Sequence, residues 1–174
     1  MKRVGFVAAL SFLWASAAFA EDLAEIRSAA VLDEPRGFCV DMVGSQARAS
    51  VGRPLQAHTC YAYQGRIAVD QGVSRDAALR GVLRFPHFGV CLIGDSSRAG
   101  GAIMLTSCAA DVAATIVLDG PRIKPLEDFG LCLTIAGGRS RTGNGGTPPH
   151  LIRALTWEVC GDAATPRQDW TLRP

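Results

Sequence analysis

Three tetrapeptides decide how this sequence is interpreted: Gly37-Phe38-Cys39-Val40, Gly89-Val90-Cys91-Leu92 and Gly130-Leu131-Cys132-Leu133. Each is a glycine, an apolar residue, a cysteine and a second apolar residue, and their starts are 52 and 41 residues apart. Each is followed, after a short apolar stretch, by a second cysteine: Cys60, Cys108 and Cys160. Self-similarity at a period of about 45 residues indicates a repeat architecture, so we expect three copies of one structural unit.

The first twenty residues have the features of a secretory signal peptide. Met1-Lys2-Arg3 is a short basic start, residues 4–19 are apolar or small, and Ala18-Phe19-Ala20 is a small-residue cleavage pattern. No other apolar run in the sequence approaches the roughly 20 residues that a membrane-spanning helix needs. We therefore expect cleavage after residue 20 and an exported protein, periplasmic or secreted, without an integral membrane segment. An uncleaved N-terminal anchor is the alternative.

The repeat predicts how the six cysteines pair. An even number of cysteines in an exported chain indicates disulfide bonds, although six cysteines allow 15 connectivities. If the units fold alike, each joins its own two cysteines: Cys39 with Cys60, Cys91 with Cys108, and Cys132 with Cys160. Zinc is the alternative, but the sequence has no Cys-x-x-Cys and no histidine at a ligand-like spacing from a cysteine. We expect no metal and no cofactor.

Composition and charge exclude several classes of function. The chain is 48% hydrophobic and 20% charged, which is ordinary for a globular protein. Without Lys2 and Arg3, its 18 basic residues become 16, equal to its 16 acidic residues. A protein that binds nucleic acid through phosphate contacts is usually more basic, and no basic run favours an anionic membrane surface. We expect neither a nucleic-acid nor a membrane partner.

The secondary-structure signal is that of an all-β protein. Clusters of Gly, Pro, Ser and Asp separate short apolar runs, which are typical of strands. These runs cover residues 38–43, 67–69, 90–93, 103–105, 115–118, 131–135 and 151–157. Residues 22–30 are expected to form one helical turn or a loose arm, and the glycine-rich residues 136–149 a long mobile hairpin loop.

Three β-rich units fit one closed architecture best. A propeller usually has at least four blades, whereas the β-trefoil is a threefold barrel that removes its sheet edges. We therefore predict a β-trefoil of three pseudo-threefold repeats, each with an internal disulfide. The predicted boundaries are a signal peptide at 1–20, an N-terminal arm at 21–30 and a trefoil at 31–174, with repeats at about 31–80, 81–121 and 122–174.

The cysteine pattern, together with the ending Gln168-Asp169-Trp170, resembles the ricin B-type β-trefoil lectins over about residues 32–172. That family carries a Gln-x-Trp near the end of each repeat. The first two repeats depart from it, and we assign Gly65-Arg66-Ile67 and Ala114-Thr115-Ile116 to the motif's position. The apolar third residue is kept, as a core layer requires. We expect Trp170 to lie in the core and Gln168 to brace a turn.

The resemblance implies where a sugar would bind. In the family, a carboxylate two residues after the first cysteine accepts hydrogen bonds from sugar hydroxyls. An aromatic side chain two residues before the second cysteine stacks on the sugar ring, and an amide near the Gln-x-Trp completes the site. In the first repeat these three positions carry Asp41, His58 and Gln64, and Gln56, four residues before Cys60, is the fourth predicted site residue. Because His58 stacks more weakly than a larger ring, Tyr61 or Tyr63 is an alternative stacking partner.

The other two repeats are less suited to a sugar. The equivalent positions carry Ile93, Met104 and Thr106 in the second repeat, and Thr134, Thr156 and Glu158 in the third. We therefore expect at most one sugar site, in the first repeat. The alternative interpretation of its residues is structural: Asp41 caps a turn, and His58 is a core or surface histidine.

These observations predict an exported, non-catalytic carbohydrate-binding module. The sequence shows no Ser/His/Asp order and no paired-carboxylate motif that would indicate an enzyme. The alternative is a degenerate trefoil whose sugar sites have decayed. Such a protein would serve as a protein–protein interaction module or a toxin-like accessory subunit.

Overall fold

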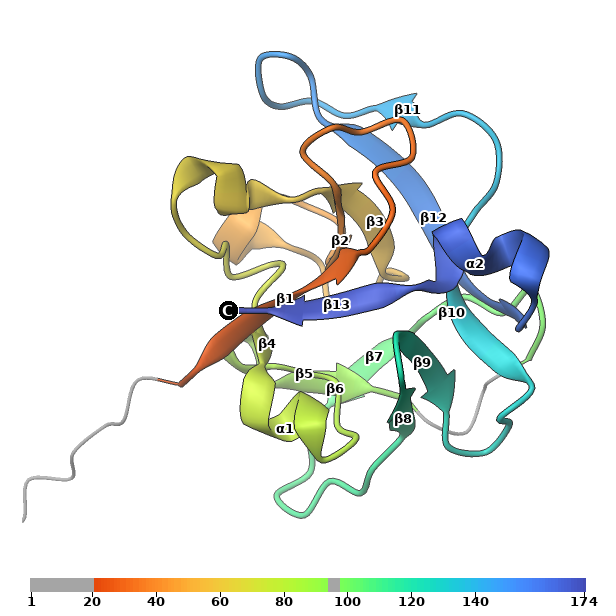
Figure 1. Ribbon diagram of the computed structural model, residues 1–174. Helices are drawn as coiled ribbons and strands as arrows, with labels where there is room; N and C mark the ends of the chain where they lie inside the picture. Colours follow the sequence, from red (N-terminus) through yellow and green to blue (C-terminus); the bar gives the residue numbers. More distant parts are fainter. Residues whose placement is uncertain (1–20, 94–97) are drawn as a thin grey trace, which may run out of the picture.

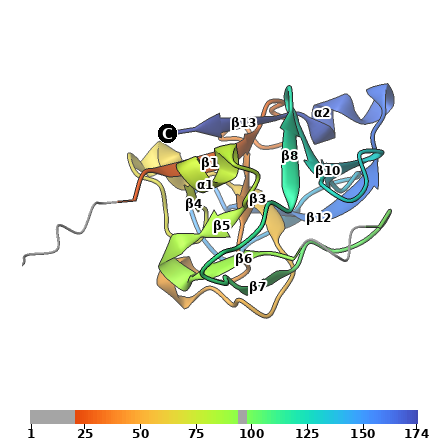
Figure 2. The ribbon, with the colours of Figure 1, turned by 90° about the horizontal axis from the view of Figure 1, so that it is seen from below.

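The structure of the chain is a computed structural model that describes residues 21–93 and 98–174 (Figures 1 and 2). The predicted signal peptide lies outside the described residues. Most of the regular structure is β. The strands are β1 (Leu23–Ser28), β2 (Phe38–Asp41), β3 (Gln56–Thr59), β4 (Val73–Ser74), β5 (Arg84–Phe85), β6 (Val90–Leu92), β7 (Leu105–Ser107), β8 (Ile116–Asp119), β9 (Arg122–Pro125), β10 (Leu131–Ile135), β11 (Arg141–Thr142), β12 (Leu151–Val159) and β13 (Trp170–Arg173).

Short helical segments connect some of these strands. They are the α-helices α1 (Arg75–Leu79) and α2 (Thr165–Gln168) and the 3₁₀ turns Gln46–Arg48, Tyr61–Gln64, Pro86–Phe88 and Asp162–Ala164. The pattern of short apolar runs did not predict α1, which begins where the Ser74 hydroxyl accepts a hydrogen bond from the Ala77 N–H. Within residues 21–93 and 98–174, no helix has the length and apolar character needed to span a membrane.

The three units share one hydrogen-bonding register. In each unit the first cysteine lies opposite the residue two before the second cysteine. These pairs are Cys39 with His58, Cys91 with Thr106, and Cys132 with Glu158. The N–H of the second cysteine donates to the carbonyl of the tetrapeptide's glycine at 2.9, 2.9 and 2.8 Å. The three repeats therefore have the same local geometry, and their equivalent positions can be compared directly.

The predicted disulfide pairing is confirmed. Each bond joins the two cysteines of one unit: Cys39–Cys60, Cys91–Cys108 and Cys132–Cys160. The Cα atoms are 4.9, 5.1 and 5.1 Å apart. Each bond closes a loop within its own unit, and a loop of this size restricts the unfolded chain by about 3 kcal/mol in the chain-entropy model.

The largest sheet joins the two ends of the described chain. Its strand order is β10-β12-β3-β2-β1-β13, with β11 paired to β12 and β4 paired to β1, while β5-β6-β7 and β8-β9 form smaller sheets. Strands β1 and β13 run side by side through the middle of the view in Figure 1. The expected turn or arm at residues 22–30 is therefore wrong. Ala24 and Ile26 alternate into the core while the backbone of β1 pairs with β2 and β13.

All three units contribute to one apolar core. Phe38, Phe85 and Trp157 are among its largest fully buried side chains. Trp170 is 4% exposed, and its indole N–H donates to the Leu133 carbonyl at 2.9 Å. The tryptophan thus fills the core while its one polar atom is satisfied.

The first-repeat counterpart of the Gln-x-Trp is Gln71-Gly72-Val73, which corrects the assignment to residues 65–67. The side-chain oxygen of Gln168 accepts a hydrogen bond from the backbone N–H of the residue after the second cysteine of its repeat. Its NH₂ group donates two hydrogen bonds, one to the side chain two residues after the first cysteine and one to the backbone carbonyl of the residue before the second cysteine. Its partners are Gly161, Thr134 and Val159, at 3.1, 3.0 and 3.0 Å. Gln71 makes the equivalent bonds to Tyr61, Asp41 and Thr59, at 2.9, 3.0 and 3.0 Å.

The loop before the glutamine differs in length between the repeats. Gln71 follows its cysteine by 11 residues and Gln168 by 8, so the count that reaches Gln168 in the third repeat does not reach Gln71 in the first. The apolar third positions are then Val73, Ile116 and Trp170, which begin β4, β8 and β13 and are all buried. The run at residues 67–69 is accordingly not a strand.

Candidate functional site

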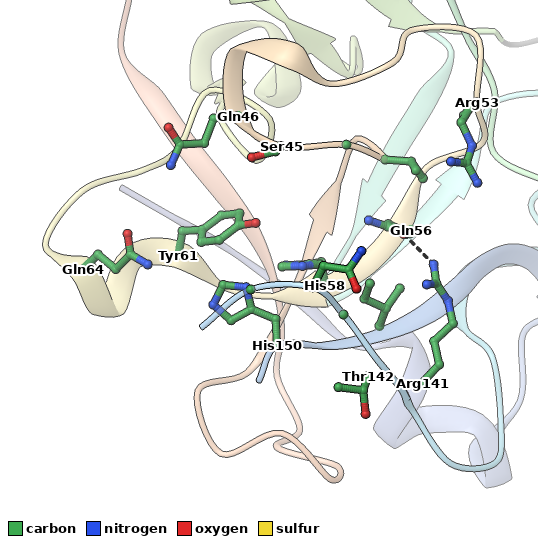
Figure 3. Close-up of a pocket in the computed structure, with 16 residues that line it drawn as sticks. Ser45, Gln46, Arg53, Gln56, His58, Tyr61, Gln64, Arg141, Thr142 and His150 are labelled. Carbon is green, nitrogen blue, oxygen red and sulfur yellow. Dashed lines mark hydrogen bonds between the residues drawn. The ribbon is translucent and has the colours of Figure 1, made fainter. Parts of the chain in front are cut away.

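A pocket of about 450 Å³ opens over the first repeat (Figure 3). Gln56, His58 and Gln64 line this pocket, so three of the four residues predicted for a sugar site lie together. The full lining consists of Val43, Gly44, Ser45, Gln46, Arg53, Gln56, His58, Tyr61, Gln64, Arg141, Thr142, Gly143, Asn144, Gly145, His150 and Ile152. The pocket therefore lies between the first repeat and a hairpin of the third.

Asp41, the fourth predicted residue, lies behind the pocket wall. Its side chain is only 1% exposed. Its two carboxyl oxygens accept hydrogen bonds from Gln56 at 2.7 Å and from Gln71 at 3.0 Å. Burial raises the pKa of Asp41 well above its usual range, although these hydrogen bonds oppose the shift, and the nearby Asp70 carboxyl raises it further. Asp41 thus orients Gln56 from the interior.

Gln56 connects this buried carboxyl to the pocket. Its NH₂ group donates to Asp41, and its oxygen accepts from the Arg141 guanidinium at 3.1 Å, as the dashed line in Figure 3 shows. The orientation of the amide follows from Arg141, because a guanidinium only donates and the atom that faces it must therefore be the amide oxygen. The side chain is 5% exposed and is held at both ends.

Three rings form a cluster at one end of the pocket. The centroids of His58, Tyr61 and His150 are 5.0 to 5.2 Å apart. Burial lowers the pKa of His58 to about 4 and also lowers the pKa of His150, so both imidazoles are uncharged at neutral pH. Nδ1 of His58 lies 2.9 Å from the Thr59 carbonyl and must donate to it, which leaves Nε2 as an acceptor. His58 and His150 are buried, and the half-buried Tyr61 is the ring of this uncharged cluster that is most open to a flat ligand.

The glycine-rich hairpin of the third repeat supplies the opposite wall. Its strand β11 pairs with β12, and the N–H of Gly143 donates to the His150 carbonyl at 2.7 Å. The N–H of His150 donates in turn to the Gly145 carbonyl. Residues 136–149, predicted as a loop between strands, thus contribute Arg141, Asn144 and their neighbours to the first-repeat pocket.

Arg36 fastens this hairpin to the first repeat. Its guanidinium donates to the carbonyls of Pro148 and Pro149, both at 2.9 Å, and forms an ion pair with Glu34 at 2.8 Å. Burial would raise the pKa of Glu34, but hydrogen bonds from Arg36 and Thr59 outweigh it and lower this pKa to about 2. The carboxylate is therefore charged and fully engaged with Arg36.

A turn at residues 43–48 closes the pocket on its remaining side. Gln46 adopts a positive φ of 46°, and its N–H donates to the buried Asp70 carboxylate at 2.6 Å. Asp70 directly precedes Gln71, which begins the first-repeat counterpart of the Gln-x-Trp. Asp70 is therefore the residue nearest to the place where the resemblance implies a sugar-binding amide. Gln64, the residue predicted for that role, lines the rim of the pocket and donates a hydrogen bond from its NH₂ group to the Tyr63 hydroxyl at 3.0 Å.

Several lining residues were not predicted from the sequence. Gln46, Arg53, Arg141 and Asn144 carry no motif, and His150 was not assigned to the site. The one available signal was the 28-residue separation of the third pair of cysteines, against 21 and 17 in the other two. That excess length indicated an extra loop without showing where it packs.

Within residues 21–93 and 98–174, the equivalent positions of the other repeats do not bring a ring and an amide together as the first repeat does. Thr134, Thr156 and Glu158 line an open depression of about 540 Å³ whose described lining includes no aromatic side chain. Glu158 accepts a hydrogen bond from Thr156 at 2.9 Å. In the second repeat, Ile93 and Met104 face each other across the strand pair and offer only apolar side chains.

One group of potential metal ligands occurs in the described part of the chain. It consists of Glu25, Cys39 and Cys60. The two sulfur atoms form a disulfide bond with each other, which leaves a single carboxylate. This group is therefore no metal centre.

Comparison with known proteins bears on the fold. No family model and no curated protein matches the chain. Among solved structures, it is similar to the β-trefoil lectin of the Vibrio vulnificus hemolysin/cytolysin, determined with N-acetyl-D-lactosamine bound. The TM-score is 0.53 at 16% identity, over 88% of this chain and 95% of that one. The chain folds as a β-trefoil. This confirms the fold predicted from the repeat.

Proposed function

We propose that this protein is a non-catalytic carbohydrate-binding module and that its first-repeat pocket holds the sugar. The observation that carries the proposal is the ring cluster of His58, Tyr61 and His150 beside the fixed amide of Gln56, all in one open pocket. A solved β-trefoil of similar fold binds N-acetyl-D-lactosamine, which supports this function.

The lining matches the two kinds of surface that a sugar offers. A sugar ring has C–H groups on its faces, which stack on flat side chains, and hydroxyls on its edges, which need donors and acceptors. The flat side chains are those of Tyr61 and the two histidines. The hydrogen-bond donors and acceptors are the amide groups of Gln46, Gln56 and Asn144.

We propose one sugar site per chain. The second repeat has the apolar Ile93 and Met104 where the first has Asp41 and Gln56, and the depression in the third lacks a stacking ring among its described residues. Export is part of the proposal. The N-terminal signal pattern and the three disulfides support a periplasmic or secreted location.

A glycan array tests the proposal. The protein, expressed with its own leader and purified in oxidised form, should bind a defined set of glycans. Tyr61→Ala should abolish this binding, whereas Tyr61→Phe should retain it because the ring remains. Phe129→Ala is the matched control, since Phe129 is a 56% exposed aromatic side chain outside the pocket lining.

Absence of binding to every glycan would overturn the proposal. The protein-interaction alternative would then be the better interpretation. Binding that survives Tyr61→Ala, with the melting temperature unchanged, would place the sugar elsewhere. The depression at Thr156 and Glu158 would be the next place to examine.

A further inference from the structure

The charge of the pocket is opposite to the charge that the family pattern implies. A carboxylate is the expected sugar contact, yet no carboxylate lines the pocket in the described part of the chain. The charged residues of the lining are Arg53 and Arg141, and both are exposed. The histidines of the lining add no charge at neutral pH, because burial lowers the pKa of both.

The nearby carboxyl groups are directed into the protein. Asp41 is 1% exposed and engaged by two amides, and Asp70 is fully buried and accepts from the Gln46 backbone. Burial raises the pKa of both groups, which opposes their negative charge. Glu34 is neutralised by Arg36. None of these groups is therefore placed to cancel the charge of the two arginines.

Neither of the two pocket arginines forms an ion pair with a carboxylate in the described part of the chain. Other arginines of the chain pair closely with carboxylates: Arg36, Arg153 and Arg173 do so at 2.7 to 2.8 Å. Within residues 21–93 and 98–174, Arg53 and Arg141 have no such partner, and the only side-chain hydrogen bond of Arg141 goes to the neutral amide of Gln56. Because the chain without its leader has no net charge, this local excess does not follow from composition.

We infer that the pocket binds an acidic sugar, one that carries a carboxylate or sulfate group. This inference rests on the proposed carbohydrate-binding function. In Figure 3 the rings of Tyr61 and His150 lie at one end of the pocket and the two arginines at the other. A sugar ring stacked at the first end therefore directs a charged substituent toward the second. The planar guanidinium fork matches a carboxylate through two parallel hydrogen bonds.

The test compares three glycans with the same disaccharide core, two of which carry an acidic substituent, either a sialic acid residue or a sulfate. N-acetyllactosamine, its sialylated form and its sulfated form are titrated calorimetrically against the oxidised protein. We expect the affinity of both acidic forms to be at least about tenfold higher than that of the neutral form, since a charged hydrogen bond is stronger than a neutral one. A preference between the two acidic forms distinguishes a carboxylate site from a site for negative charge in general.

Substitutions locate the effect. Arg141→Gln and Arg53→Gln should each reduce the preference for the acidic glycans over the neutral one by about tenfold. Arg141→Lys keeps the charge without the fork and should lie between wild type and Arg141→Gln. Arg139→Gln is the control, because Arg139 is an exposed arginine of the same hairpin outside the pocket lining.

Three outcomes would overturn the inference. If the neutral glycan binds as tightly as the acidic ones, the proposed function stands and the acidic preference falls. If Arg139→Gln weakens binding as much as Arg141→Gln, the attraction is non-specific and no acidic subsite exists. If no glycan binds, the inference falls together with the proposed function.

Discussion

Gln56 donates a 2.7 Å hydrogen bond to Asp41 across the wall that separates the pocket from the protein interior. The two residues also face each other in the register of β2 and β3. Asp41 therefore acts on the pocket through Gln56, as a positioning residue. The arrangement needs a neutral donor at position 56, because Asp41 presents only acceptors when ionised.

Gln56→Glu should make folding strongly pH-dependent. One oxygen of the new carboxylate would meet Arg141, but the other would face Asp41, and two adjacent buried carboxyls raise each other's pKa. The variant would be stable below pH about 4, the unfolded-state pKa of the new glutamate, and would lose this stability as pH rises through the higher pKa of the folded state. We expect urea denaturation to show a loss of about 2 kcal/mol or more at pH 7, much reduced at pH 4. Gln64→Glu, on the exposed rim, should show no such dependence.

His58 should weaken the fold in mild acid. Its imidazole titrates near 6.5 when unfolded, whereas burial lowers its pKa to about 4 in the fold. Between these values the unfolded chain takes up a proton that the folded chain does not. The contribution of His58 is thus fully present above pH 6.5 and lost as pH falls toward 4, by up to about 3 kcal/mol.

The measurement is the pH dependence of chemical denaturation for His58→Phe, which keeps a ring without a titrating nitrogen. Its stability should fall less steeply than that of the wild type between pH 6.5 and 4. His87→Gln, at an exposed position in the second repeat, is the control. An unchanged slope in His58→Phe would contradict the prediction.

Gln71 and Gln168 have equivalent structural roles but different functional ones. Both side chains are fully buried, and removing either amide leaves a backbone N–H and two acceptors without their partner. Gln71→Ala and Gln168→Ala should each lower the free energy of unfolding by about 2 kcal/mol or more. Only Gln71→Ala should also weaken glycan binding, because Gln71 holds Asp41 and thereby Gln56. Equal losses of binding in both variants would show a general effect of instability.

The architecture could be predicted because it depends on local, repeated features. The spacing of six cysteines and the glycine of each tetrapeptide recur in all three units. Matching pairs of cysteines therefore predicted the disulfides, and counting from each cysteine predicted the equivalent positions of the repeats, such as Asp41, Ile93 and Thr134. The exact place of the first Gln-x-Trp counterpart could not be counted, because the loop before Gln71 differs in length from the loop before Gln168.

The pocket was harder to predict because it depends on contacts between distant segments. The turn around Gln46, which closes one side of the pocket, is held by Asp70 from 24 residues away. Arg141 lies 85 residues from Gln56, and its position follows from the hairpin that Arg36 fastens. No spacing within the first repeat encodes these contacts.

Gln46 is predicted to trade stability for binding. A left-handed backbone conformation costs a residue with a side chain about 1 kcal/mol, and Gln46 adopts it with φ of 46° in the turn that closes the pocket. Gln46→Gly should therefore raise the free energy of unfolding by about 1 kcal/mol, since glycine adopts this conformation freely and the backbone N–H to Asp70 remains. The same variant should weaken glycan binding because it removes an amide from the lining. Gln46→Ala separates the two effects: it should lose the same affinity without gaining stability. If Gln46→Gly binds as tightly as the wild type, the side chain makes no contact with the ligand, and the turn serves only to cover Asp70.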